Sequence, residues 1–131
     1  MNDRKTDLLI RIKNAYLARH LEMRVPYFKL GEMMSRVLVD NGYLDKITVE
    51  TDKKQKGKIL FMKLKYDGHK PALENILLVS KPGVRIYQGV KKISYTKLGI
   101  GIRLISTSTG ILTGQEAKKK NLGGEVIAEV W

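Results

Sequence analysis

The hydrophobic residues of this 131-residue chain change their spacing near residue 45, from a helical repeat to the alternation that is typical of β-strands. Before this point, the sequence predicts two helices separated by a short extended segment around Pro26. The core face of the first helix comprises Leu8, Ile12, Ala15, Tyr16 and Arg19, with Leu9 at its edge. The second helix has apolar residues at helical spacing, and Asn41-Gly42 predicts its end.

After residue 45, strands are predicted at 47–51 and 58–66, and they form a hairpin that covers the two helices. Residues 76–80 and 84–87 flank Lys81-Pro82-Gly83, which favours a tight type II turn, so we expect a second hairpin here. Further strands are predicted at 100–106 and 125–130. In the last strand, alternation places Val126, Ala128 and Val130 on one face and Glu125, Ile127 and Glu129 on the other.

A short helix is predicted between these last two strands, because Thr113 and Glu116 form a capping-box pattern and Asn121 is followed by glycines. The fold class is therefore α+β, with two small, tightly packed α/β modules. The first module, residues 1–67, has the order α-β-α-β-β. The second, residues 68–131, is mostly β with the short helix between its last two strands.

The charge of the chain indicates what it binds. It has 25 Lys and Arg residues against 13 Asp and Glu, a formal net charge of +12, which favours a polyanionic partner. Residues before Asp67 carry 15 − 8 = +7 and the rest 10 − 5 = +5, so the anion-binding surface is expected to involve both halves. The chain starts with a charged helix rather than an apolar signal sequence, and we expect it to be cytoplasmic and not to bind a membrane.

The most informative loop is Ser106-Thr107-Ser108-Thr109-Gly110, because four hydroxyl residues before a glycine can approach another backbone closely. Such hydroxyls can contact a phosphate, a ribose 2′-OH or a base edge. The alternative is that they make local turns with their own backbone.

Two further groups of side chains suggest contacts with nucleic acid. Arg4, Asp7, Arg11 and Asn14 form a polar stripe on the first helix, and the alternative is an ordinary solvated face with ion pairs between successive turns. Arg85 and Tyr87 alternate towards one side of a strand and could place a guanidinium and a ring against nucleotides. The alternative for Tyr87 is a ring half-buried in the sheet.

Catalytic patterns are missing from the sequence. His20 and His69 have no partners at metal-ligand spacing, and Gly99-Ile100-Gly101 lacks the third glycine of a dinucleotide fingerprint. The chain has no Cys, which excludes thiol nucleophiles and Cys-ligated zinc. We therefore expect a protein that is not an enzyme and that has no metal site and no cofactor. A small phosphate-processing enzyme stays a minor alternative.

With these motifs in order, the chain resembles a known family, the bacterial-type small-subunit ribosomal protein called "S eight". The resemblance rests on segments spread over the whole chain, which are residues 7–15, Val25-Pro26 with Lys29-Leu30, residues 80–87, residues 99–102, Ser106-Thr107-Ser108 with Gly110, and residues 123–126 near Trp131. The Lys-Pro-Gly, Ser-Thr-Ser and Gly-Gly-Glu motifs are specific only in combination.

This resemblance implies a structural constituent of the small ribosomal subunit, a primary rRNA-binding protein that binds and organises the central domain of small-subunit rRNA. It places the primary contact in the second module, at Ser106, Thr107, Ser108, Tyr87, Gly124 and Glu125. A second contact in the first module is implied at Thr6, Asp7, Arg11 and Asn14. Neighbouring ribosomal proteins and its own-operon mRNA are further implied partners. An organelle-encoded copy and a free-standing translational regulator remain alternatives.

The chain departs from the family pattern at three places. Thr109 stands where the family usually has Lys, which puts one expected phosphate contact in question. Phe28 stands where the family usually has Ser, which removes a natural N-cap of the second helix. Asp3-Arg4 replaces the common Asp-Pro, which changes how the first helix begins and adds charge.

Overall fold

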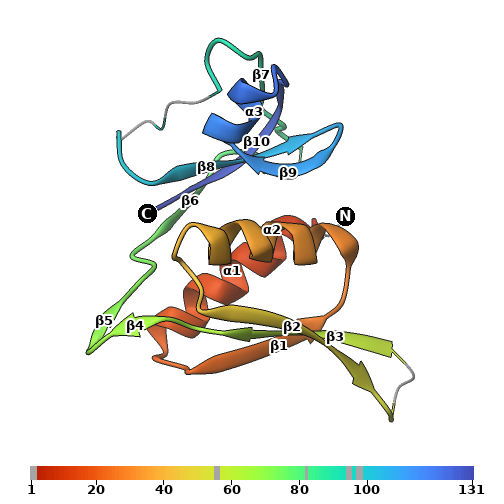
Figure 1. Ribbon diagram of the computed structural model, residues 1–131, viewed down its shortest axis with the longest axis vertical. Coiled ribbons are helices and arrows are strands. Elements are labelled where there is room, and N and C mark those ends of the chain that lie inside the picture. The colour runs from red at the N-terminus through yellow and green to blue at the C-terminus, as the bar shows by residue number, and fades with distance from the viewer. Residues whose placement is uncertain (1–2, 55–56, 82, 94–95, 97–98) are drawn as a thin grey trace.

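The computed structural model describes residues 3–54, 57–81, 83–93, 96 and 99–131, which form an α+β fold in two stacked parts (Figure 1). The first part contains α1 (Arg4–Leu17), β1 (Glu22–Pro26), α2 (Lys29–Asp40), β2 (Lys46–Asp52) and β3 (Gly57–Lys63). Two very short strands, β4 (Tyr66–Asp67) and β5 (Lys70–Pro71), follow. The second part contains β6 (Ile76–Leu78), β7 (Tyr87–Gln88), β8 (Ile102–Thr107), β9 (Gly110–Thr113), α3 (Gly114–Lys119) and β10 (Gly124–Val130).

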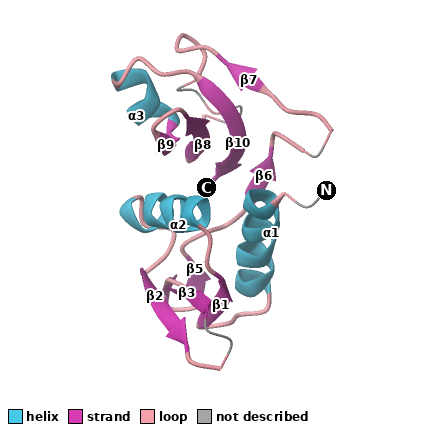
Figure 2. Cartoon of the chain, turned by 90° about the vertical axis from the view of Figure 1, so that its right-hand side faces the viewer, coloured by secondary structure: helices cyan, strands magenta, loops and turns pink. Residues whose placement is uncertain are grey.

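The first sheet has the antiparallel strand order β1-β3-β2. Strands β2 and β3 form the predicted hairpin, and β1 adds a third strand on the free edge of β3, with Val25 opposite Leu60. Strand β3 ends at Lys63, earlier than predicted, and Tyr66 begins β4 instead. Both helices lie on one face of this sheet, as Figures 1 and 2 show.

The ends of the two helices follow local signals in the sequence. Asp3 caps α1 by accepting hydrogen bonds from the N–H groups of Lys5 and Thr6, whereas Phe28 caps α2 without a side-chain bond, as predicted. Gly42 has φ +83° just after α2, which fits the expected stop. The placement of Arg19 on the core face of α1 was wrong, because the helix ends at Leu17 and Arg19 is exposed with φ +61°.

Strand β10 lies inside the second sheet. It pairs with β8 along one side and with β6 and β7 along its other side, and β9 lies beyond β8. The predicted hairpin of 76–80 with 84–87 is wrong, because β6 and β7 each pair with β10 instead of with each other. Lys81 and Val84 still exchange two backbone hydrogen bonds of 2.9 Å, and Gly83 has φ +84°. Pro82 of the predicted turn lies outside the described residues.

The expected short helix is confirmed as α3, since the Thr113 hydroxyl accepts from the Glu116 N–H at 3.1 Å and Asn121 follows with φ +58°. The sequence did not predict β9, which pairs with β8 and shortens the hydroxyl loop to a tight turn. The simple alternation predicted for β10 was also wrong. A register shift against β8 lies between Val126 and Ala128, so Ile127 joins Ala128 and Val130 in the main core and Val126 packs elsewhere.

The two parts share one hydrophobic core. Its buried residues come from both, and include Leu8, Met34, Leu38, Leu60, Leu104, Ile111 and Val130. Helix α2 lies between the two sheets in both views and contacts β2 on one side and β9 on the other (Figures 1 and 2). The predicted boundary after residue 67 falls between β4 and β5, and the division into modules at this point stays a prediction.

Candidate nucleic-acid interface

Three of the predicted contact residues lie side by side across the second sheet. Tyr87 of β7 is the register partner of Glu125 in β10, and Glu125 is in turn the partner of Ser106 in β8. Because directly paired residues project from the same face of a sheet, these side chains form one row. The Tyr87 side chain is 71% exposed, so its ring is not buried in the sheet.

Gly124 keeps β8 and β10 close together at the end of this row. A Cβ atom at Gly124 would lie 2.2 Å from the backbone oxygen of Ser106, which is far inside van der Waals contact. Gly124 therefore allows the Ser106 backbone to approach β10 closely, because a glycine has no Cβ atom at this point.

The hydroxyl residues of the β8–β9 turn divide into bound and free groups. The Thr107 hydroxyl donates to the carbonyl of Gly110 at 2.8 Å and accepts from the N–H of Thr109 at 3.2 Å. This is the local turn chemistry that was the alternative reading of the loop. Ser108 is exposed at the tip, and its hydroxyl makes no hydrogen bond with any residue that the structure describes. The Thr107 hydroxyl thus stabilises the conformation of the turn, whereas the Ser108 hydroxyl is available to bind a ligand.

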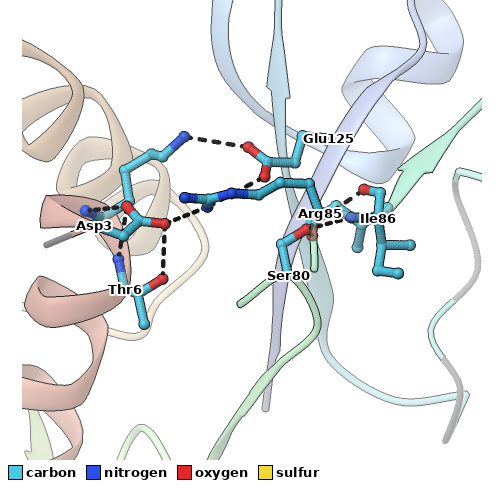
Figure 3. Close-up of polar contacts among 8 residues, drawn as sticks. Asp3, Thr6, Ser80, Arg85, Ile86 and Glu125 are labelled. Atoms are coloured by element: carbon cyan, nitrogen blue, oxygen red, sulfur yellow. Dashed lines mark hydrogen bonds and ion pairs between the residues drawn. The ribbon is translucent and has the colours of Figure 1, made fainter. Parts of the chain in front are cut away.

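The start of α1 meets the row at a cluster of charges (Figure 3). The buried Glu125 carboxylate lies 3.3 Å from Lys5 Nζ and 3.4 Å from Arg85 Nη1. Arg85 Nη1 also donates to Asp3 Oδ2 at 2.5 Å. These contacts join the beginning of α1 to β10 and to the loop before β7, so they fix the start of α1 relative to the second sheet.

Thr6 and Asp3 complete this cluster. The Thr6 hydroxyl donates to Asp3 Oδ2 at 3.1 Å, and Thr6 is buried. Burial of Asp3 raises the pKa of its carboxyl, but hydrogen bonds from Arg85, Thr6 and Lys5 together outweigh this effect and hold the pKa below its ordinary value. Asp3 is therefore ionised at neutral pH and balances Arg85. Because their polar atoms already have partners, Thr6 serves mainly to position Asp3, and Glu125 to position Lys5 and Arg85.

The remaining predicted residues lie along the outer face of α1. Arg11 Nε is 3.1 Å from Asp7 Oδ2, and both side chains are more than half exposed, as expected for an ion pair between successive turns. Asn14 is exposed and lies eight residues after Thr6, about 12 Å along the helix. The structure thus brings Thr6 to the row and leaves Arg11 and Asn14 on a separate stretch of surface.

Asp3, Lys5 and Ser80 belong to this site but were not singled out from the sequence. Asp3 carries a readable signal, since an aspartate directly before a helical repeat is a common N-cap. Ser80 is buried and bonds to the backbone of both Ile86 and Val126, so only the tertiary structure reveals it. Lys5 has no distinguishing pattern, because its partner Glu125 is 120 residues away.

The site contains cations, hydroxyls and an exposed ring. No group of acidic or histidine side chains suited to a metal occurs among the described residues. In the same part of the chain, no helix has both the length and the apolar composition needed to span a bilayer. Together, such cations, hydroxyls and an exposed ring can recognise an anionic ligand that carries aromatic bases.

Comparison with known proteins identifies the family of this chain. A family model described as "Ribosomal protein S8" matches residues 3–131. The chain belongs to the ribosomal protein S8 family. It is 42% identical over 135 residues to "Small ribosomal subunit protein uS8" of Persephonella marina, covering 100% of this chain and 99% of the relative.

Other relatives carry the same name. The protein of Trichormus variabilis is 40% identical over 130 residues, which is 99% of this chain and 98% of the relative, and that of Alcanivorax borkumensis is 38% identical over the same shares. The resemblance inferred from the motifs is therefore confirmed. Because the ribosomal protein S8 family consists of structural proteins, membership also confirms that the chain is not an enzyme.

Proposed function

We propose that this chain, a structural constituent of the small ribosomal subunit, binds and organises the central domain of small-subunit rRNA as a primary binding protein. Membership of the S8 family and the name shared by its relatives support the ribosomal role. The choice of the central domain follows from the family resemblance of the motifs. A cytoplasmic location and contacts with neighbouring ribosomal proteins are part of the same proposal.

The observation that carries the proposal is the row of Tyr87, Glu125 and Ser106, with the free Ser108 hydroxyl beyond its end. An exposed ring can stack on an unpaired base, and a free hydroxyl can bond to a ribose or a base edge. These contacts suit a distorted RNA helix, where bases and riboses are accessible. Residues 68–131 would thus make the primary contact.

The start of the first module would supply the second contact, within residues 1–67. The cluster of Asp3, Lys5, Arg85 and Glu125 fixes the start of α1 beside the row, so an RNA that extends past the row in this direction would also meet the outer face of α1. The net charge of +12 supplies salt-dependent attraction to phosphates, and the neutral groups supply the choice of site.

Replacing Ser108 with Ala tests the assignment of the loop. We expect the affinity for a central-domain rRNA fragment to fall by about 1–2 kcal/mol, the order of one hydrogen bond to a buried or charged partner. The slope of log affinity against log salt should not change, because a neutral side chain releases no counterion. Fluorescence anisotropy over a salt series measures both quantities.

Thr48→Val is the matched control, because it removes an exposed hydroxyl from β2, far from the row. If Ser108→Ala binds as tightly as the control, the loop has been assigned wrongly. Co-sedimentation with small subunits after a high-salt wash addresses the wider role. Release into the soluble fraction, together with tight binding to its own-operon mRNA, would favour the free-standing regulator.

A further inference from the structure

A groove on the first module lies between α1 and the segment that joins β1 to α2. Its α1 side carries the charged residues Arg4, Asp7 and Arg11, and its other side is formed by Pro26, Tyr27 and Phe28. One wall is therefore polar and the other is apolar and aromatic. Arg4 lies two residues before Thr6 in the first turn of α1, so the groove begins next to the end of the helix that meets the row.

Arg4 and Phe28 face each other across this groove. The guanidinium carbon of Arg4 lies 5.7 Å from the centroid of the Phe28 ring, within the range of a cation–π contact. The ring itself is pressed against the first turn of α2, because a Cβ atom at Gly31 would lie 2.5 Å from Phe28 Cε1. Phe28 thus provides a fixed surface that holds the planar guanidinium.

The Arg4 guanidinium keeps its hydrogen-bonding capacity. It makes no hydrogen bond or ion pair with the described residues, and the one carboxylate that lines the groove, Asp7, is paired with Arg11 at 3.1 Å. Arg24 offers a direct contrast, because it lies 4.7 Å from the Phe61 ring but is also 3.2 Å from Glu22 and 3.6 Å from Glu50. Of these two stacked arginines, Arg4 is the one without an acidic partner.

We propose that this groove binds one unpaired nucleotide of the RNA. The phosphate accepts hydrogen bonds from the free Arg4 N–H groups, and the base stacks on the guanidinium plane and the aromatic wall. Stacking of bases on arginine and aromatic side chains is the usual way in which proteins hold unpaired nucleotides. This inference rests on the proposed RNA-binding function and adds a specific subsite to it.

Two substitutions at Arg4 separate its charge from its shape. Arg4→Ala should weaken binding of the central-domain rRNA fragment by about tenfold, the order of one lost stacking contact, and lower the salt slope by about 0.7. Arg4→Lys keeps the charge but lacks the flat guanidinium. It should therefore keep the salt slope of the parent and still lose affinity.

Chemical probing of the bound RNA gives a second, independent readout. A reagent that modifies unpaired base edges should show one nucleotide protected by the parent protein and exposed with Arg4→Lys or Phe28→Leu. Arg24→Ala is the matched control and should leave both affinity and protection unchanged, since its guanidinium is already paired with carboxylates. Thermal melting of each variant shows whether it is folded.

The proposal is overturned if Arg4→Ala and Arg24→Ala bind the RNA equally well, or if folded Arg4→Lys and Phe28→Leu variants expose no base. A groove that takes an acidic peptide instead would leave both the RNA affinity and the base protection unchanged. Failure of this proposal can be told apart from failure of the proposed function. If the proposed function is wrong, the parent protein itself does not select the central-domain fragment.

Discussion

The buried hydroxyl of Ser80 lies where the chain leaves the second sheet and returns to it. It donates to the carbonyl of Val126 at 2.7 Å and accepts from the N–H of Ile86 at 2.9 Å. The loop between β6 and β7 leaves the sheet at this point. The Ser80 hydroxyl therefore binds the Val126 carbonyl of β10 in place of a backbone N–H group. The loop carries Arg85, so this hydroxyl fixes the base of the segment that reaches α1.

The family resemblance marks Arg4 and Phe28 as two departures from the usual pattern, and the structure places these two side chains in contact. Phe28 occupies the N-cap position of α2, but its side chain makes no cap hydrogen bond and so does not replace the one a serine would make. The aromatic ring instead supports the added arginine. The two departures thus act together, which neither position indicates alone.

Asp3→Asn tests the charge cluster through its pH dependence. The amide still accepts the capping hydrogen bonds, but the charge that balances Arg85 is lost. Because the folded pKa of Asp3 lies below the ordinary value of 3.8, its charge stabilises the parent above this pH and ceases to do so as the pH falls through the folded pKa. We expect the variant to be less stable near neutral pH, and the difference to shrink below about pH 3.8.

Urea unfolding of parent and variant at neutral and acidic pH measures this difference. Asp67→Asn is a suitable control, since it removes an exposed carboxylate that has no ion pair within the described chain. A stability difference between parent and Asp3→Asn that stays constant down to the acid limit would contradict the role of the Asp3 charge.

At the scale of elements, local signals predicted helix ends and non-local pairing did not follow from the sequence. The Thr113 capping box and the Asn41-Gly42 stop act within a few residues, and both are found as expected. The pairing of β6 and β7 with β10 depends on residues 36 to 54 positions later in the chain, which alternation and turn patterns do not encode. The register shift near Ile127 also depends on pairing with a distant strand, so the alternation pattern could not predict it.

The candidate site was predictable to a similar extent. The motifs named Ser106, Ser108 and Tyr87, which lie on or beyond one row of the sheet. They did not reveal that Glu125 is buried between two cations, because these come from α1 and from the loop before β7. Whether these residues contact RNA stays a prediction.

Gly124→Ala tests the close approach of β8 and β10. The added Cβ would press on the Ser106 backbone, which belongs to the sheet and cannot swing aside as a side chain can. We expect a loss of about 1–3 kcal/mol in the free energy of unfolding, as for other overpacked sites. Weaker RNA binding should accompany it, because Ser106 moves within the row.

Gly89→Ala is the control for this substitution, because nothing lies within 4 Å of the Cβ that it would add. Its free energy of unfolding should stay within about 0.5 kcal/mol of the parent. Equal stability of the two variants, measured by urea denaturation, would show that β8 and β10 can separate at little cost.

At the scale of the whole molecule, the shared core ties the two parts together. Leu8 and Met34 of the first part belong to the same buried cluster as Leu104 and Val130 of the second. Removing either part would expose this apolar surface to water. The modules are therefore expected to depend on each other for stability, even if each has its own role in binding.

A single unfolding transition is the expected result. Trp131 is the one tryptophan of the chain, and its backbone exchanges hydrogen bonds with Asn75, so its fluorescence reports on the second part. Far-UV circular dichroism reports largely on α1 and α2, the longest helices described. The two signals should change together in urea, whereas two separate midpoints would mean that the parts unfold independently.

The position of β10 along the chain affects how a new copy of the protein folds. Strands β6 and β7 have no other strand partner among the described residues, and both precede β10 in the order of synthesis. During synthesis, the backbone N–H and C=O groups of β6 and β7 therefore stay unpaired until β10 has been made, and unpaired strands of this kind are prone to aggregate. The second sheet is therefore completed late, when residues 124–130 emerge and close it.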